Sequence, residues 1–233
     1  ENGVEKGLMT LVDENRQDEL LANLDKHQHK RNCGGSAANT IIATSQLGAN
    51  SYYSCKVASD ETGDFYWDDL KAKGLNSNLE SGRFDGVTGK CMVFITPDAD
   101  RTMNTYLGIT ATYSKEQIVD DELLKAEWVY LEGYLVTGDS GRAAAVHARE
   151  LAQANGKKVA LTFSDPGIVG YFKDGFKEIM GDKKLDLLFC NDAEAMSYTD
   201  TKSVEEAYVA LKDVAHTFAI TLGAKGALIF DGN

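Results

Sequence analysis

The sequence predicts an α/β fold with a mostly parallel central sheet and a small antiparallel β lid. From residue 127 onward, apolar strand-like segments alternate with helical patterns of about 10 to 15 residues, as in sheets built from parallel strands. Between about 75 and 107 this alternation gives way to two strands around a turn. No Ser/Gly-rich linker and no repeat divides the chain, which predicts one domain over residues 1–233.

The N-terminal part of the chain predicts three helices. Asp13 is a suitable N-cap for a helix that carries Leu20, Leu21 and Leu24 on one side at helical spacing. The polar residues 27–31 predict an exposed strand or loop. Residues 36–47 and 62–73 predict two further helices, and residues 51–58 between them predict a strand.

The predicted lid contains a pair of strands. Residues 89–96 and 101–107 have strand-like patterns, and they are joined by residues 97–100, whose Pro and Asp residues suit a tight bend. The opening segment also departs from the alternation of the main domain. We therefore expect the lid to be formed by residues 7–33 and 75–107, roughly.

The remaining chain predicts a regular alternation of strands and helices. The strands are expected over residues 127–131, 158–163, 185–190, 217–222 and 227–230. The helices are expected over residues 140–154, 167–180 and 203–214. The last strand leads into a turn at residues 231–233, and no strand precedes Gly7, so we expect an internal section of a longer protein.

The composition argues against several classes of protein. There are 24 Lys and Arg against 36 Asp and Glu, a net charge of −12, and no basic block offsets it, so a nucleic-acid partner is not expected. No apolar run approaches the roughly 20 residues of a membrane span, and no signal peptide is seen. The four cysteines are widely spaced, which predicts reduced thiols in a cytoplasmic protein rather than disulfides or a zinc site.

A glycine pair precedes the second predicted helix. Gly34 and Gly35 permit backbone angles that other residues avoid, so the chain can bend sharply or approach a ligand closely there. Asn39 follows one turn into the helix, where its amide could reach the hydroxyls of a sugar. A tight strand-to-helix turn with a solvated Asn explains the same pattern.

An Asn and a Glu three residues apart follow the strand at 185–190. Ligands of parallel sheets bind at the carboxyl ends of strands, and Asn191 and Glu194 share one face of a starting helix there. They could orient the water around a Mg²⁺ ion that keeps most of its hydration shell. The alternative is a helix start with acidic residues near its positive end.

A third motif of small residues ends the strand at 217–222. Thr221, Gly223 and Gly226 let backbone N–H groups face a phosphate or the ribose of a nucleotide. The segment is neither a P-loop nor a dinucleotide-binding glycine motif. A hairpin turn that contains glycine explains it about as well.

Arg101 lies at the start of the second strand of the predicted lid. Its planar, always-charged guanidinium could close over a phosphate on a movable flap. The alternative is a surface arginine that pairs with Asp98 or Asp100.

Together and in this order, these motifs resemble the ribokinase (PfkB) family of ATP-dependent sugar and nucleoside kinases. The first motif with Gly48, Asp60 and Gly63 is similar to the N-terminal signature, Asn191 and Glu194 match the Asn-x-x-Glu motif, and residues 221–226 resemble the nucleotide-binding Thr-x-Gly-x-x-Gly segment. Residues 7–13 and Arg101 look more like the adenosine-kinase branch than ribokinase proper. The resemblance implies a ribokinase-like three-layer fold.

The resemblance also implies roles for these residues and two cofactors, ATP and Mg²⁺. Gly34 and Gly35 would be the hinge of the lid, Asn39 would contact hydroxyls of the acceptor, and Arg101 would approach the acceptor or the transferring phosphoryl group. Asn191 and Glu194 would hold Mg²⁺ through water. Thr221, Gly223 and Gly226 would bind ATP. The Asp base of the family's Asp-Thr-x-Gly-Ala-Gly-Asp motif is not in the sequence and is expected beyond Asn233, so the chain would form an incomplete kinase domain.

These observations predict an ATP-dependent kinase that phosphorylates a primary hydroxyl of a sugar or nucleoside. One alternative is a non-catalytic relative that binds a nucleotide or a sugar. Another is an unrelated α/β domain in which all three motifs are turns. The exposed edges of a small lid sheet could also pair two copies of the chain into a homodimer.

Overall fold

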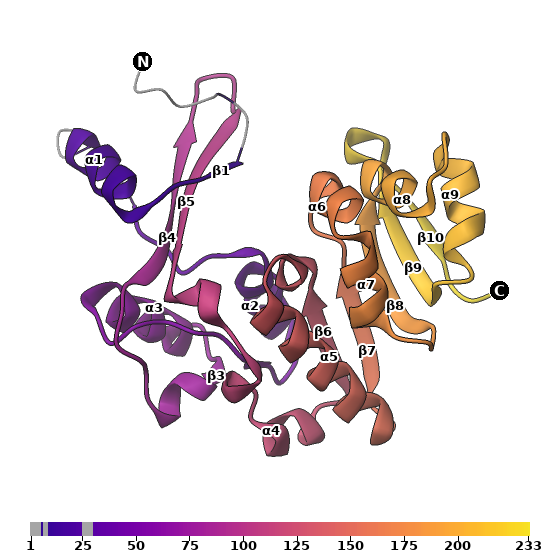
Figure 1. Ribbon diagram of the computed structural model, residues 1–233, viewed down its shortest axis with the longest axis horizontal. Coiled ribbons are helices and arrows are strands. Elements are labelled where there is room, and N and C mark those ends of the chain that lie inside the picture. The colour runs from indigo at the N-terminus through magenta and orange to yellow at the C-terminus, as the bar shows by residue number, and fades with distance from the viewer. Residues whose placement is uncertain (1–5, 7–8, 25–29) are drawn as a thin grey trace. The chain divides into compact units, whose positions relative to one another are not determined.

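The computed structural model describes residue 6 and residues 9–24 and 30–233 (Figure 1). The chain divides into two compact units, unit 1 over residues 1–112 and unit 2 over residues 113–233, and each is described by itself. The single domain over residues 1–233 stays a prediction. No helix in the described part of the chain is long and apolar enough to cross a membrane.

Unit 1 contains a three-stranded sheet in the order β1-β5-β4. β4 (Thr88–Ile95) and β5 (Arg101–Gly108) form the predicted antiparallel hairpin, with Ile95 opposite Arg101. β1 (Met9–Leu11) pairs with β5 in parallel, so the sheet is mixed rather than antiparallel as predicted. The turn at 97–100 forces only β4 and β5 to run in opposite directions; β1 is joined to neither strand by a hairpin, so its direction is free.

The first predicted helix is confirmed as α1 (Glu14–Leu24). Asp13 caps it, since its Oδ1 accepts a hydrogen bond from the Arg16 N–H at 2.8 Å. Leu20 is fully buried, and α1 packs on β5. Most of the predicted polar strand or loop at 27–31, including His27 and His29, lies outside the described residues.

The helices predicted after the glycine pair and after Asp60 are confirmed as α2 (Ser36–Gln46) and α3 (Glu61–Ala72). The strand predicted over 51–58 is wrong beyond its first residues: only β2 (Tyr52–Tyr53) forms, parallel to β3 (Asn76–Ser77).

A side chain interrupts the predicted strand. The Asn78 amide accepts from the Cys55 N–H and donates to the Cys55 carbonyl, each at 2.9 Å. It therefore uses both backbone groups that a neighbouring strand would need.

Unit 2 contains a five-stranded sheet in the order β10-β9-β8-β7-β6. β6 to β9 are parallel, and β10 runs antiparallel to β9. The five predicted strands are all confirmed, as β6 (Trp128–Glu132), β7 (Lys158–Thr162), β8 (Leu185–Asn191), β9 (Ala215–Thr221) and β10 (Ala227–Phe230).

Of the three helices predicted in unit 2, those over 140–154 and 203–214 are confirmed and the third is divided. The helix predicted over 167–180 is two helices, α6 (Pro166–Tyr171) and α7 (Lys173–Met180), because Phe172 leaves helical geometry with φ −111° and ψ 31°. The other helices are α4 (Asp120–Lys125), α5 (Asp139–Ala154), α8 (Asp192–Thr199) and α9 (Val204–Leu211). Short 3₁₀ turns lie at Asn78–Ser81, Ile109–Thr112, Lys115–Gln117, Gly133–Thr137 and Gly223–Lys225.

The core of unit 2 lies between the sheet and its helices. Leu161, Leu188 and Phe218 are fully buried in one cluster with residues of α5, α7, α8 and α9. Side chains alternate between the two faces of a strand, so Phe189 and Ile229 lie on the other face. Their exposed fractions of 39% and 62% show that this face is only partly covered. At the carboxyl edge of this sheet, the helices of unit 2 therefore lie on one side.

Candidate active site

Two of the predicted motifs meet at the carboxyl edge of the sheet in unit 2. Asn191 ends β8 and Thr221 ends β9, and the two residues are direct register partners across these parallel strands. The Thr221 hydroxyl donates to the Cys190 carbonyl at 3.5 Å, which ties the two strand ends together. Motifs 30 residues apart in the sequence thus form one continuous edge.

Asn191 and Glu194 form a reciprocal cap at the start of α8. Asn191 Oδ1 accepts from the Glu194 N–H at 2.8 Å, and Glu194 Oε2 accepts from the Asn191 N–H at 3.0 Å. The Asn191 amide also donates to Glu194 Oε1 at 2.8 Å. The helix-start interpretation is therefore correct as local structure, and the same bonds hold the Glu194 carboxyl in one orientation.

The environment of Glu194 disfavours its negative charge. The side chain is only 5% exposed, and this burial is the largest cause that raises its pKa. The bond from the Asn191 N–H acts in the opposite sense, and the charges of Asp165 and Glu132 raise the pKa further. A cation near this carboxyl would offset both the cost of burying its charge and the repulsion from the neighbouring carboxylates.

Glu132 and Asp165 form an acidic extension of this edge that the sequence analysis did not single out. Glu132 ends β6, and its carboxylate accepts a hydrogen bond from Ser164, which follows β7 and also accepts from the Gly133 N–H at 3.1 Å. Asp165 caps α6 through the N–H groups of the next turn. The signal that could have found both residues is their position within two residues of the end of a predicted strand.

The same three carboxylates, those of Glu132, Asp165 and Glu194, also affect the pKa of Tyr134. Burial raises the pKa of Tyr134, and the charges of Asp165, Glu132 and Glu194 raise it further. The three carboxylates, which lie at the ends of β6, β7 and β8, are therefore all close enough to Tyr134 to act on it electrostatically. Within the described residues, however, no group of three or more His, Cys, Asp or Glu side chains is arranged to ligate a metal directly.

The third motif forms the connection between β9 and β10, so the hairpin-turn interpretation is also correct as local structure. The Leu222 N–H donates to the Gly226 carbonyl at 2.8 Å, and Gly223 and Gly226 adopt φ of 58° and 97°, which favour glycine. A Cβ atom at either glycine would meet no atom within 4 Å. The backbone of this loop is therefore open to a ligand.

In unit 1 the glycine pair and Asn39 lie at the start of α2. Gly35 precedes the helix with φ 110°, which confirms the unusual backbone angle predicted there. The Gly34 carbonyl accepts a hydrogen bond from the Tyr66 hydroxyl at 3.1 Å. Asn39 is exposed one turn later, with its N–H bonded to the Gly35 carbonyl.

The Arg101 guanidinium does not form the predicted ion pair with Asp98 or Asp100, although the Arg101 N–H donates to Asp100 Oδ1 at 3.0 Å. Both carboxylates instead face Lys6, with Asp98 in close contact and Asp100 at 4.0 Å. The Arg101 side chain is exposed at the start of β5, and it forms no ion pair with the described residues. Its guanidinium is thus available to a ligand.

Within unit 2 the structure brings part of the predicted site together. Asn191, Glu194, Thr221 and the two glycines of the loop share one edge of unit 2. Gly34, Gly35, Asn39 and Arg101 belong to unit 1.

Comparison with known proteins agrees with this arrangement of motifs. The chain is 23% identical over 198 residues to the ribokinase of Staphylococcus aureus and 22% identical over 202 residues to that of Mus musculus, in each case over 84% of its own length. It spans only about 60% of the length of these two curated relatives, 60% and 59% respectively.

Two solved structures are similar in both sequence and fold. The adenosine kinase of Sinorhizobium meliloti is 31% identical, with a TM-score of 0.89 over 99% of this chain and 70% of that one. A probable sugar kinase of Rhizobium etli is 30% identical, with a TM-score of 0.90 over 100% of this chain and 70% of that one. These neighbours confirm the predicted ribokinase-like α/β fold.

The sequence profile described as "pfkB family carbohydrate kinase" matches residues 9–233, nearly the whole chain. Its matched region includes the strand-end edge of unit 2 and the glycine pair and Arg101 of unit 1. The chain therefore belongs to the pfkB family of carbohydrate kinases.

Proposed function

We propose that the protein transfers the γ-phosphoryl group of ATP to a primary hydroxyl of a sugar or nucleoside. The observation that carries the proposal is the pairing of Asn191 with Thr221, which joins a magnesium-type motif and a nucleotide-type loop at one sheet edge. Ligands of parallel sheets bind at this kind of edge. The similarity to ribokinases and to an adenosine kinase supports both acceptor classes.

The residues at this edge fit a hydrated Mg²⁺ ion and the phosphates of ATP. The amide of Asn191 and the carboxylate of Glu194 are oxygen donors of the kind Mg²⁺ accepts, and they suit an ion that keeps several waters. When bound, the ion would neutralise phosphate charge. Thr221, Gly223 and Gly226 would hold the nucleotide, because the loop exposes its backbone on the open side.

The acceptor would be held by residues of unit 1. Asn39 presents an exposed amide that can exchange hydrogen bonds with sugar hydroxyls, and Arg101 presents an exposed guanidinium that can bind phosphoryl oxygens. Gly34 and Gly35 would act as the hinge by which the lid, residues 7–33 and 75–107, closes on the acceptor. No residue of this chain is assigned as the general base. Reduced thiols and ATP make the cytoplasm the compartment proposed with this function.

The direct test is phosphoryl transfer by the purified full-length protein. ATP is supplied with Mg²⁺ and with either adenosine or ribose, and the phosphorylated product is identified by mass spectrometry while ADP is measured. We expect product from at least one acceptor, and none when EDTA removes the Mg²⁺. ATP binding without product from any sugar or nucleoside would favour a non-catalytic binding protein over a kinase.

Sedimentation in the same buffer tests the homodimer, which we propose forms through the sheet of β1, β4 and β5.

A further inference from the structure

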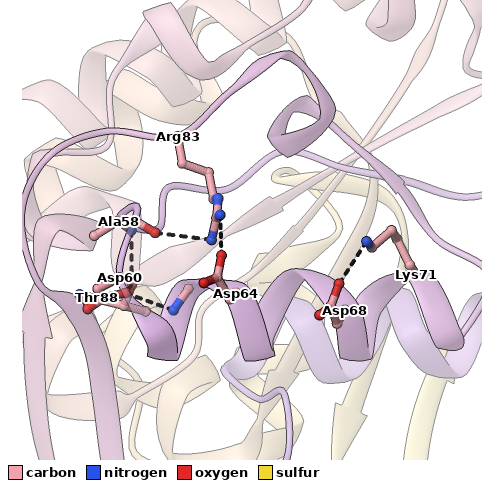
Figure 2. Close-up of polar contacts among 8 residues, drawn as sticks. Ala58, Asp60, Asp64, Asp68, Lys71, Arg83 and Thr88 are labelled. Carbon is pink, nitrogen blue, oxygen red and sulfur yellow. Dashed lines mark hydrogen bonds and ion pairs between the residues drawn. The ribbon is translucent and has the colours of Figure 1, made fainter.

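Asp60 joins the start of α3 to the start of β4. Its Oδ1 accepts from the Gly63 N–H at 2.8 Å, which caps α3, and from the Thr88 hydroxyl at 2.5 Å (Figure 2). Its Oδ2 accepts from the Thr88 N–H at 2.9 Å. One carboxylate therefore makes a helix cap and two bonds to the first residue of the β4–β5 hairpin.

The same junction is buried and closely packed. Thr88 is 2% exposed, and its hydroxyl also accepts from the buried Ala58 N–H at 2.9 Å. A Cβ atom at Gly63 would lie 2.0 Å from the Ala58 carbonyl, so α3 approaches this segment as closely as a glycine allows. Arg83 donates to the Ala58 carbonyl at 3.5 Å and contacts Asp64 of α3 (Figure 2).

The returning strand is held at the same level. Thr88 is the register partner of Gly108, the last residue of β5, and the Ile109 N–H donates to the Val87 carbonyl at 2.8 Å. Lys56 holds the chain after β5, with its ammonium 3.0 Å from the Thr112 carbonyl. Residues 56–64 therefore fix both strands of the hairpin at its base.

The hairpin converts a small change at its base into a large movement at Arg101. Arg101 pairs with Ile95, at the other end of β4 from Thr88. At about 3.4 Å per residue, these ends lie about 24 Å apart, so a rotation of about 10° at Thr88 would move Arg101 by about 4 Å. A displacement of about 1 Å can already cost a reaction about a hundredfold in rate.

We propose that Asp60 is a positioning residue, which sets the direction of the β4–β5 hairpin through Thr88 and thereby places Arg101 for phosphoryl transfer. This inference rests on the proposed kinase function. Asp60 itself touches no substrate; it acts through the two bonds to Thr88, while its bond to Gly63 only begins α3.

Two substitutions separate these roles. Asp60→Asn keeps an oxygen for the Gly63 N–H, and Asn caps helices as well as Asp does, but its amide nitrogen cannot accept from the Thr88 N–H. Thr88→Val removes the hydroxyl, whereas Thr88→Ser keeps it. Asp68→Asn is the matched control: it makes the same change on the same helix, where Asp68 pairs with Lys71 at 2.7 Å on the surface (Figure 2).

Steady-state kinetics test the positioning. We expect Asp60→Asn and Thr88→Val to lower kcat about tenfold or more, with the KM for ATP unchanged because its proposed ligands lie in unit 2. Thr88→Ser and Asp68→Asn should stay within about twofold of the wild type. In an Arg101→Ala background, Asp60→Asn should cost less than about twofold more. An equal factor in both backgrounds, or no loss in either, would overturn the proposal.

Hydrogen exchange separates this inference from the kinase function. Without any ligand, Asp60→Asn should speed exchange of the Thr88 N–H and of amides in β4 and β5, and leave those of α3 unchanged. If the wild type phosphorylates no acceptor, the kinase function fails and exchange alone decides whether Asp60 fixes the hairpin. Unchanged exchange at Thr88 would then overturn it, as would equally faster exchange throughout α3.

Discussion

Asn191 and Glu194 bind each other through three hydrogen bonds, two of which also cap α8. The residues proposed to orient a hydrated Mg²⁺ are thus the residues that start the helix. A substitution at either position can act on stability, on function, or on both. Variants that keep the cap while changing the remaining chemistry can separate the two effects.

Asn191→Ser should separate stability from function at this position. A serine hydroxyl can still accept from the Glu194 N–H, so the midpoint of thermal unfolding should stay close to that of the wild type. Asn191→Ala should lower the free energy of unfolding by about 1 kcal/mol. Both variants lack the amide and should lose most Mg²⁺-dependent phosphoryl transfer. Full activity in Asn191→Ser would show that only the cap matters.

Glu194→Gln should weaken function without lowering the stability of the folded chain. The pKa of Glu194 is raised in the folded chain by burial and by the charges of neighbouring carboxylates, so ionising this carboxyl as the pH rises through the folded pKa costs stability. Gln can still accept the capping bond from the Asn191 N–H, although its amide nitrogen cannot accept the second bond from the Asn191 amide, and the substitution removes this charge. We expect an unfolding midpoint at or above that of the wild type in Mg²⁺-free buffer, together with a raised Mg²⁺ requirement. A clear loss of stability would contradict the electrostatic argument.

Gly223→Val should weaken ATP binding. The added side chain would occupy the open side of the loop, and φ 58° is strained for a β-branched residue. Gly156→Val is the matched control, because Gly156 also has a positive φ, 66°, with open space around it, but follows α5 away from this edge. Titration calorimetry with ATP and Mg²⁺ should show at least about tenfold weaker binding for Gly223→Val only. Equal affinities would favour a plain hairpin turn.

Stability at acid pH should depend on Asp60. Burial acts to raise its pKa, but the hydrogen bonds from Thr88 and Gly63 outweigh it, so the pKa lies below the ordinary value. Its contribution is therefore present above the unfolded pKa of about 3.9 and is lost as the pH falls toward the lower folded value. In urea titrations from pH 6 to pH 3, Asp60→Asn should show a smaller loss of stability than the wild type. An identical pH dependence in both proteins would contradict this assignment.

The sequence by itself determined most elements and the location of the motifs. Periodic apolar residues predicted all five strands of unit 2, and Asp13 and Gly35 marked the starts of α1 and α2 correctly. These signals are local, because a cap or a positive φ depends on residues only a few positions apart. The position of Asn191 and Thr221 at the ends of apolar strands could be predicted for the same reason.

Only the tertiary structure decided features that depend on distant partners. Asn78 ends the predicted strand at Cys55 from 23 residues away, and the direction of β1 depends on its pairing with β5. The acidic neighbours Glu132 and Asp165 come from the ends of other strands, and no local sequence pattern predicts that their charges act on Glu194. Asp60 likewise looks in sequence like a simple helix cap; its bonds to Thr88, 28 residues later, arise only when α3 and β4 pack together.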